Sequence, residues 1–211
     1  MDLRHPLGVV TTSVDGDVLR VLALADAEFT ASRVHELVGE HSLAGVRNSL
    51  ERLSVQGIVL RRGAGQAYLY QLNREHLAAA AIGELARLRE RLIERLVGEL
   101  KTWQVPALYC SLFGSVVRGD MSTESDIDIL VIRSKRVLGD NELWGAQLYE
   151  LGRKIKTWTG NSADVLEYGE EELHGEAMHD PVIVRALQEG IVLCGESSTW
   201  KLRSTKKLMT T

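Results

Sequence analysis

The pattern of hydrophobic and polar positions changes character along the chain. In its first third, apolar residues recur every three or four positions, which predicts helices. Three such helices are expected, over residues 14–27, 31–38 and 43–56. Two β-rich runs around a Gly-rich turn follow them, at residues 58–62 and 67–72, and predict a hairpin.

Three helices followed by a hairpin resemble a winged helix-turn-helix domain, which we place at residues 1–75. In such a domain the third helix usually enters the major groove of DNA, and the wing contacts phosphates. The residues that match these roles here are Ala44, Gly45, Asn48, Arg52, Arg61 and Arg62. A module for protein contact, or a scaffold, stays open, because Glu51 lies on the same helix face. If DNA is bound, we expect a homodimer, because one such module buries little surface.

A long helical stretch comes next, over residues 74–103, and its core forms a linking helix at residues 76–103. Gly83 is the position at which this stretch is expected to break or kink. Its stripe of leucines either packs against the flanking domains or forms a dimer seam. The spacing is not sustained over enough heptads to predict a coiled coil.

Strands and helices alternate in residues 104–196. The strands are predicted at residues 106–113, 126–132, 163–168 and 191–194. The helices are predicted at residues 115–119, 141–157 and 181–190, the last with Asp180 as N-cap and Pro181 in its first turn. This pattern predicts a small mixed sheet flanked by helices, so the fold class is α+β with two domains. Residues 197–211 form a basic tail without periodicity, which is predicted to be mobile.

Two acids interrupt the otherwise apolar strand at residues 126–132. Asp126 and Asp128 are two residues apart, so their side chains point to the same face of the strand and repel each other. A divalent cation removes that repulsion. The turn at Gly114 and Ser115, just upstream, offers backbone N–H groups that suit phosphate. Metal and phosphate together indicate nucleotidyl transfer.

The motif Gly114-Ser115-x-x-Arg118-Gly119, followed by Ser125-Asp126-x-Asp128, resembles the signature of the DNA polymerase β nucleotidyltransferase superfamily. Minimal nucleotidyltransferases of prokaryotes are the most similar members. The resemblance implies an Mg-dependent enzyme that transfers a nucleoside monophosphate, AMP from ATP in the first instance, to a hydroxyl acceptor.

The same resemblance implies a role for each motif residue. Asp126 and Asp128 would be catalytic and would bind two Mg²⁺ ions, and Gly114 and Ser115 would hold the nucleotide phosphates. A third carboxylate completes the metal site in this superfamily and acts as the base. Asp164 fits that place in the next strand, although Glu167 lies nearby.

Arg118 has two interpretations, which the sequence leaves open. It either contacts phosphate as part of the nucleotide-binding site or fixes the loop by a salt bridge to Asp120 or Glu124. Other titratable residues are given no chemical role. His174 and His179 are five residues apart, which does not match a metal-binding helix face, so we expect them in solvent.

The acceptor is not encoded in a readable motif. Minimal nucleotidyltransferases that act as antitoxins transfer AMP to a toxin, so the resemblance makes a HEPN-type toxin a candidate partner. Small molecules such as aminoglycosides are another acceptor class. The alternative function is a winged-helix transcriptional regulator whose nucleotidyltransferase domain senses nucleotide or binds a partner without turnover.

Composition places the 211 residues among soluble, cytoplasmic proteins. No apolar run approaches the roughly 20 residues that span a bilayer, and the N-terminus lacks the apolar region of a signal peptide. Cys110 and Cys194 are therefore expected as buried thiols rather than a disulfide. The net charge of −4 argues against non-specific nucleic-acid binding, but residues 42–75 hold five Arg against two Glu.

Overall fold

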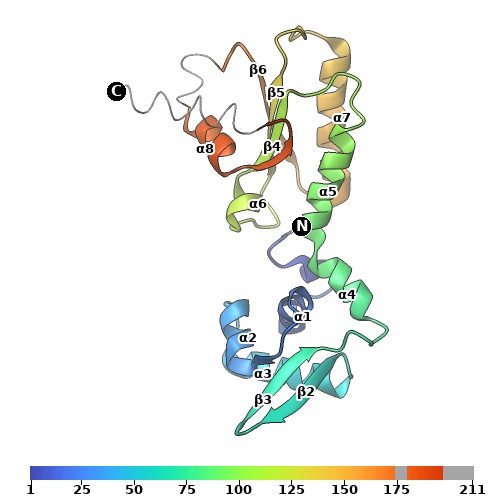
Figure 1. Cartoon of the computed structure of the whole chain (residues 1–211), viewed down its shortest axis with the longest axis vertical. Helices are drawn as coiled ribbons and strands as arrows, with labels where there is room; N and C mark the ends of the chain where they lie inside the picture. The colour runs from blue at the N-terminus through green and yellow to red at the C-terminus, as the bar shows by residue number, and fades with distance from the viewer. Residues whose placement is uncertain (174–179, 197–211) are drawn as a thin grey trace. The chain divides into compact units, whose positions relative to one another are not determined.

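The computed structural model describes residues 1–173 and 180–196, which form two compact units (Figure 1). One unit comprises Asp2–Glu90, and the other begins at Arg91 and includes Met1. His174, His179 and the tail at residues 197–211 lie outside the described residues. In the part of the chain that is described, no helix combines the length and the apolar character needed to cross a bilayer.

The N-terminal unit contains the predicted helices and hairpin. Its elements are η1 (Pro6–Val9), α1 (Val14–Leu24), β1 (Phe29–Thr30), α2 (Ala31–Val38), α3 (Leu43–Val55), β2 (Val59–Ala64), β3 (Ala67–Leu72) and α4 (Ala79–Ala86). The sheet order is β1-β3-β2, and both pairings are antiparallel. Strand β1 was missed by the sequence patterns, because two residues are too few to show an alternation.

Side-chain caps explain where two of these helices begin. The Thr30 hydroxyl accepts a hydrogen bond from the Arg33 N–H at 3.2 Å, and the Ser42 hydroxyl accepts one from the Gly45 N–H at 3.1 Å. Between the helices and the hairpin lies a continuous apolar core, to which Val18, Leu22 and Leu50 contribute fully buried side chains.

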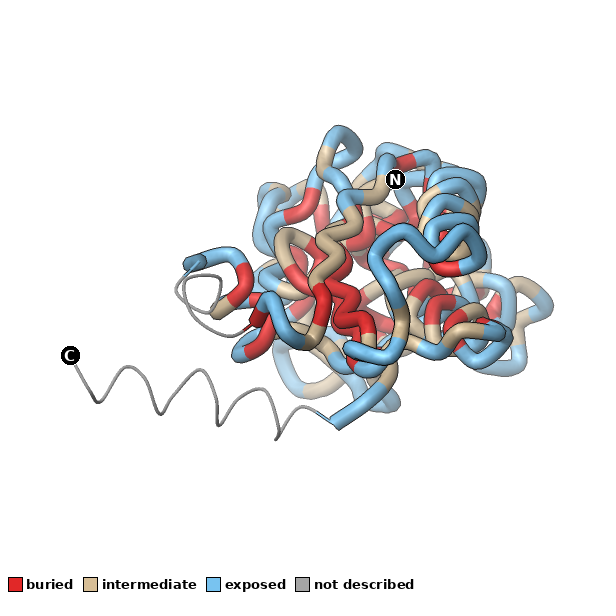
Figure 2. The backbone as a smooth tube through the Cα atoms, turned by 90° about the horizontal axis from the view of Figure 1, so that it is seen from above, coloured by how far each residue is buried: buried red, intermediate tan, exposed pale blue. Residues whose placement is uncertain are grey.

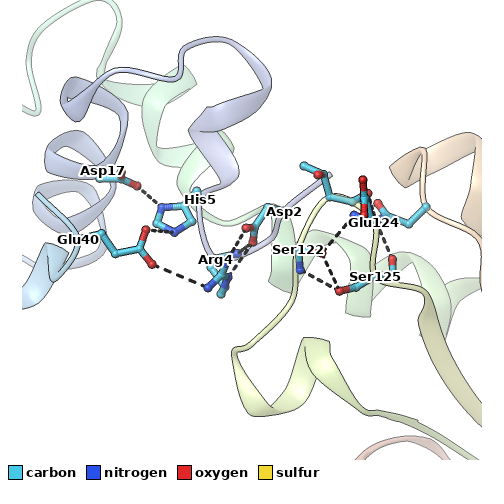
Figure 3. A network of polar contacts seen from close by, with 10 residues as sticks. Asp2, Arg4, His5, Asp17, Glu40, Ser122, Glu124 and Ser125 are labelled. Carbon is cyan, nitrogen blue, oxygen red and sulfur yellow. Dashed lines mark hydrogen bonds and ion pairs between the residues drawn. The ribbon is translucent and has the colours of Figure 1, made fainter.

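The N-terminal segment is attached to α1 by a carboxylate that two histidines share. Asp17 lies 2.7 Å from His5 Nδ1 and 2.9 Å from His41 Nε2. Glu40 also approaches His5, with its Oε2 at 3.6 Å from His5 Nε2 (Figure 3). Burial raises the pKa of Asp17, but the hydrogen bonds from the two imidazoles outweigh it and leave the pKa lowered.

The predicted linking helix is divided into two helices rather than kinked at Gly83. Gly83 stays within α4, where open space surrounds it, and the break falls at Arg87. Helix α4 packs on the core of the N-terminal unit through Ala79 and Ala86. Helix α5 (Leu88–Leu100) passes into the C-terminal unit at Arg91.

The C-terminal unit has the expected mixed sheet with helices on both faces. After α5 come β4 (Tyr109–Phe113), α6 (Ser115–Arg118), β5 (Ile127–Arg133), α7 (Glu142–Thr159), β6 (Ala163–Gly169), α8 (Pro181–Glu189) and β7 (Ile191–Cys194). The sheet order is β6-β5-β4-β7, in which only the β5–β6 pair is parallel. Helices α7 and α8 lie on opposite sides of this sheet (Figure 1). Cys110 is buried and Cys194 half-buried, and both are free thiols.

Alternation along β5 assigns its side chains to the two faces. Leu130 and Ile132 pack in a cluster with Ile183 and Leu187 of α8, so even-numbered positions face α8. Every residue of β4 is buried, and so is every residue of β5 except Asp128 (buried residues are red in Figure 2). Of these two central strands, therefore, only Asp128 is partly exposed, and it lies on the α8 side.

Candidate functional site

The candidate active site begins where β4 turns into α6. Gly114 has φ +71° and ψ −145°, a conformation open in practice only to glycine. A Cβ atom on Gly114 would lie 1.8 Å from Asp128 Oδ2, so only glycine admits the Asp128 carboxylate at this point. The antiparallel register pairs Phe113 with Asp128 and brings the two elements together. The structure thus joins two halves of the sequence motif.

A second acid lies beside Asp128 on the neighbouring strand. The parallel register of β5 and β6 pairs Asp128 with Asp164, so both carboxylates lie on the α8 face of the sheet. Asp126 precedes β5 by one residue and is exposed, at the end of a turn that the Ser122 N–H closes by donating to Ser125 Oγ at 2.9 Å (Figure 3). The strand therefore begins at Ile127, one residue later than predicted, and Asp126 lies in the turn just before it.

Glu167, the other acid of β6, has a structural partner on the opposite face. It accepts a hydrogen bond from Arg133 Nε at 2.8 Å and another from Trp144 Nε1 at 3.2 Å. Asp164, three positions earlier, is exposed on the α8 face beside Asp128. The geometry therefore favours Asp164 over Glu167 as the third acid of the site.

The electrostatics of Asp128 are unfavourable for a bare carboxylate. Partial burial raises its pKa, and the charges of Asp164 and Asp126 raise it further. A hydrogen bond from the Ser115 backbone N–H and the charge of Arg118 lower it, but they do not compensate. Carboxylates held in this way gain stability from a cation.

Ser115 contributes an unsatisfied hydroxyl at the same turn. Its Oγ is buried and has no hydrogen-bond partner among the described residues. A buried hydroxyl without a partner costs free energy, so the protein gains when a ligand supplies an acceptor. This observation was not accessible from the sequence, which indicates the hydroxyl but not its burial.

The structure does not bring the three acids together as a complete metal site. Within residues 1–173 and 180–196, no group of three or more His, Cys, Asp or Glu side chains is placed to hold a metal ion. The oxygen donors of Asp126, Asp128 and Asp164 are nevertheless of the kind that Mg²⁺ prefers. Asp164 and Asp126 repel the charge of Asp128, and a bound Mg²⁺ ion would relieve that repulsion.

A pocket of about 150 Å³ opens beside this turn. Gly114, Arg118 and Asp128 line it, as the sequence motif suggests, and Arg118 also reaches Asp120 at 3.1 Å. The salt bridge to Asp120 is therefore formed, while contact of Arg118 with phosphate stays a prediction. One wall comes from α8, which sequence reasoning did not connect with the site; that wall consists of Val182, Arg185 and Glu189.

The residues predicted to bind DNA are mostly exposed, but their charges are engaged within the N-terminal unit. Ala44, Asn48 and Arg52 are exposed on α3, while Gly45 is half-buried. Arg52 donates from Nε to Asp15 at 3.1 Å.

The two hairpin arginines are engaged in the same way. Arg62 donates from Nε to Glu28 at 2.9 Å, and this pair raises the pKa of Arg62. Arg61 lies over the ring of Tyr68, at 3.6 Å from its centroid, and is 3.8 Å from Glu51.

Arg47 is a further basic residue of α3 that was not among the residues predicted to bind DNA. It is exposed on α3 and has no ion pair with any residue in the described ranges. Together with Arg61 and Tyr68 it lines a concavity of about 350 Å³ between α2, α3 and the hairpin. Its place in the helical repeat, one turn before Glu51, was visible in the sequence, but the concavity was not.

Comparison with known proteins agrees with the motif in the C-terminal unit. Residues 103–198 match the family model described as Polymerase beta, Nucleotidyltransferase. This part of the chain, a little under half of its length, is therefore similar to polymerase beta nucleotidyltransferases. No curated protein sequence matches the chain.

Solved structures of toxin–antitoxin complexes show partial similarity. A crystal structure of a toxin–antitoxin with AMP-PNP has 19% sequence identity and a TM-score of 0.39, and the match covers 56% of this chain and 85% of the other. A mutant of the toxin–antitoxin MntA-HpeT has 18% identity and a TM-score of 0.40, with the same shares covered. Similarity at this level carries no argument about partners or activity.

Proposed function

We propose that the chain transfers a nucleoside monophosphate, AMP from ATP, to a hydroxyl acceptor. The observation that carries this proposal is the arrangement around Gly114. Asp128 and Asp164 lie side by side on one face of the sheet, next to a buried Ser115 hydroxyl that has no hydrogen-bond partner within residues 1–173 and 180–196. The nucleotidyltransferase domain supplies the reaction class.

Magnesium is the proposed cofactor, held by Asp126, Asp128 and Asp164. When bound, it would neutralise the carboxylates and the polyphosphate and lower the pKa of the attacking hydroxyl. The charge repulsion at Asp128 and the all-oxygen donor set support this ion.

The remaining residues bind and orient the nucleotide. The Ser115 hydroxyl, which lacks a partner in the described chain, donates to a phosphate oxygen. Gly114 permits the Asp128 carboxylate to approach the phosphate-binding turn. Asp164 is exposed and accepts the proton of the acceptor hydroxyl as general base.

Label transfer from ATP tests the proposal directly. The chain is incubated with ATP labelled in the α-phosphate, Mg²⁺ and candidate acceptors, and Asp126→Ala and Asp128→Ala are compared with wild type. Asp140→Ala serves as the control, because Asp140 is an exposed acid in the loop before α7. Transfer that survives Asp126→Ala would show that the assignment is wrong.

For the acceptor we propose a protein hydroxyl, with a HEPN-type toxin as the candidate partner. The support is the sequence motif alone. Co-expression with candidate toxins, followed by mass spectrometry of the toxin, tests for an added AMP. A toxin that binds without gaining AMP would favour neutralisation by contact, and a labelled small molecule would favour the other acceptor class.

A second candidate function is DNA binding by the N-terminal unit as a winged helix-turn-helix, with autoregulation of its operon. The concavity lined by Arg47 and Arg61, beside the exposed face of α3, favours it. A gel shift with upstream DNA at low salt, with and without ATP, separates this function from the first. No shift at low salt contradicts it, because phosphate contacts are strongest there.

We place the protein in the cytoplasm, where nucleotide, DNA and the proposed toxin meet.

A regulator without turnover is the alternative for the whole chain, and a homodimer is the expected DNA-binding state. Both are tested with the same samples. The regulator hypothesis would be supported if ATP changes the gel shift of the DNA and no acceptor gains label. Sedimentation of the chain with a palindromic operator distinguishes one bound copy from two.

A further inference from the structure

Helix α8 presents two different stripes of side chains. Ile183, Ala186 and Leu187 are buried and pack on the sheet. Val182, Arg185 and Glu189 follow one another at spacings of three and four residues, which places them on one helix face, and they line the pocket beside Gly114. Helix α8 is therefore a wall of the nucleotidyltransferase pocket as well as a cover for the sheet.

Several contacts fix the position of α8. Asp180 caps its first turn by accepting from the Val182 N–H at 2.8 Å. Ser111 Oγ, in the middle of β4, donates to the Ala186 carbonyl at 3.3 Å. A Cβ atom on Gly190 would lie 2.2 Å from that same carbonyl and 3.1 Å from Ser111 Cβ, so glycine is needed where the helix ends beside the strand. The face that carries Arg185 is therefore held toward the pocket by the backbone.

The two cations of the pocket differ in their engagement. Arg118 is bonded to Asp120 through Nε at 3.1 Å. Arg185 is exposed, and no hydrogen bond or ion pair joins it to any residue of the described ranges. A guanidinium that pairs with no carboxylate of the described residues, beside a glycine turn with a buried hydroxyl, is suited to bidentate binding of phosphate.

We propose that Arg185 binds the outer phosphates of the nucleoside triphosphate and so makes the site select triphosphate over monophosphate. The inference rests on the proposed nucleotidyl transfer and adds α8 to its binding site. Arg185 and Ser115 then hold the phosphate chain from two sides, and Arg118 keeps its bond to Asp120. When the acceptor oxygen attacks the α-phosphorus, the bond between the α-phosphorus and the oxygen of the β-phosphate breaks. The β- and γ-phosphates then leave as pyrophosphate, so Arg185 also contacts the leaving group.

Binding of ATP, ADP and AMP to wild type and Arg185→Gln, measured by calorimetry with Mg²⁺, tests the inference. We expect the affinity for ATP to fall by about tenfold to a hundredfold, the range of a charge-assisted hydrogen bond, while that for AMP changes by less than about twofold. Arg185→Lys keeps the charge but not the planar fork, so its loss should be smaller. Arg136→Gln is the matched control, because it removes an exposed charge of the same unit from a loop that does not line the pocket.

The outcomes separate this inference from the function on which it rests. Equal losses for ATP and AMP, or no loss for either, would overturn the role of Arg185 while label transfer by wild type still stood. Wild type that binds no nucleotide would overturn both. Melting curves of the variants identify any loss that arises from misfolding, and Arg185→Lys keeps the test decisive in that case.

Discussion

The close approach of Gly114 and Asp128 gives a quantitative prediction for Gly114→Ala. The substitution places a Cβ atom where φ is +71°, and that atom would lie 1.8 Å from Asp128 Oδ2 and 2.7 Å from its Cγ. The three nearest atoms all belong to Asp128. Two costs therefore arise, one from the backbone conformation and one from displacement of the carboxylate.

The size of each cost follows from its origin. A non-glycine residue in this region of φ and ψ costs about 1–3 kcal/mol. Overpacking against a side chain that must move costs about 1–3 kcal/mol more. We therefore expect Gly114→Ala to lower the free energy of unfolding by about 2–6 kcal/mol, a large part of the stability of a typical domain.

Urea denaturation of wild type, Gly114→Ala, Asp128→Ala and the double variant measures the two costs separately. In an Asp128→Ala background the carboxylate is absent, so Gly114→Ala should cost about 1–3 kcal/mol less than in wild type. Gly119→Ala is the control: φ is +77° there, but nothing lies within 4 Å of its Cβ atom, so only backbone strain remains. Equal losses from Gly114→Ala in both backgrounds would refute the steric argument.

Three further predictions follow from other contacts. Asp128→Asn should raise the melting temperature in the presence of EDTA and abolish label transfer, because burial and neighbouring acids disfavour its charge. Asp17→Asn should destabilise the N-terminal unit by about 1–3 kcal/mol, because His5 and His41 lose a shared charged acceptor. The pKa of Asp17 is lowered, so this difference should be present above the ordinary value of 3.8 and should shrink as the pH falls through the lowered pKa, as urea titrations at several pH values would show. Arg47→Ala should weaken DNA binding equally for all sequences and reduce the salt slope of log K by about one, as gel shifts at several salt concentrations would reveal.

Local signals in the sequence predicted the elements well, because each depends on neighbouring residues. Asp180 and Pro181 predicted the start of α8, and Asp180 does cap that helix. The mixed sheet was also predicted correctly. The sequence did not indicate which residues of different strands lie side by side. That register is set by packing between residues far apart in the chain. The alignment of Asp128 with Asp164 is of this kind.

Long-range partners explain most of what the sequence did not indicate. Arg52 and Arg62 were expected to be available for DNA, but Asp15 and Glu28 pair with them from more than 30 positions away. Arg185 lies on an ordinary amphipathic helix, and its stripe with Val182 became meaningful only when the pocket was seen. In each case the residue type was visible and its surroundings were not.

The assignment of even positions to one face of β5 limits how this strand can change length. Insertion or deletion of a single residue within Ile127–Arg133 would exchange the two faces of the residues beyond it. An insertion directly after Asp128 would turn Leu130 and Ile132 away from α8 and bring their odd-numbered neighbours toward it. Homologues of this chain should therefore vary in the loops at either end of β5, while the strand itself keeps a constant number of residues from Asp128 onward.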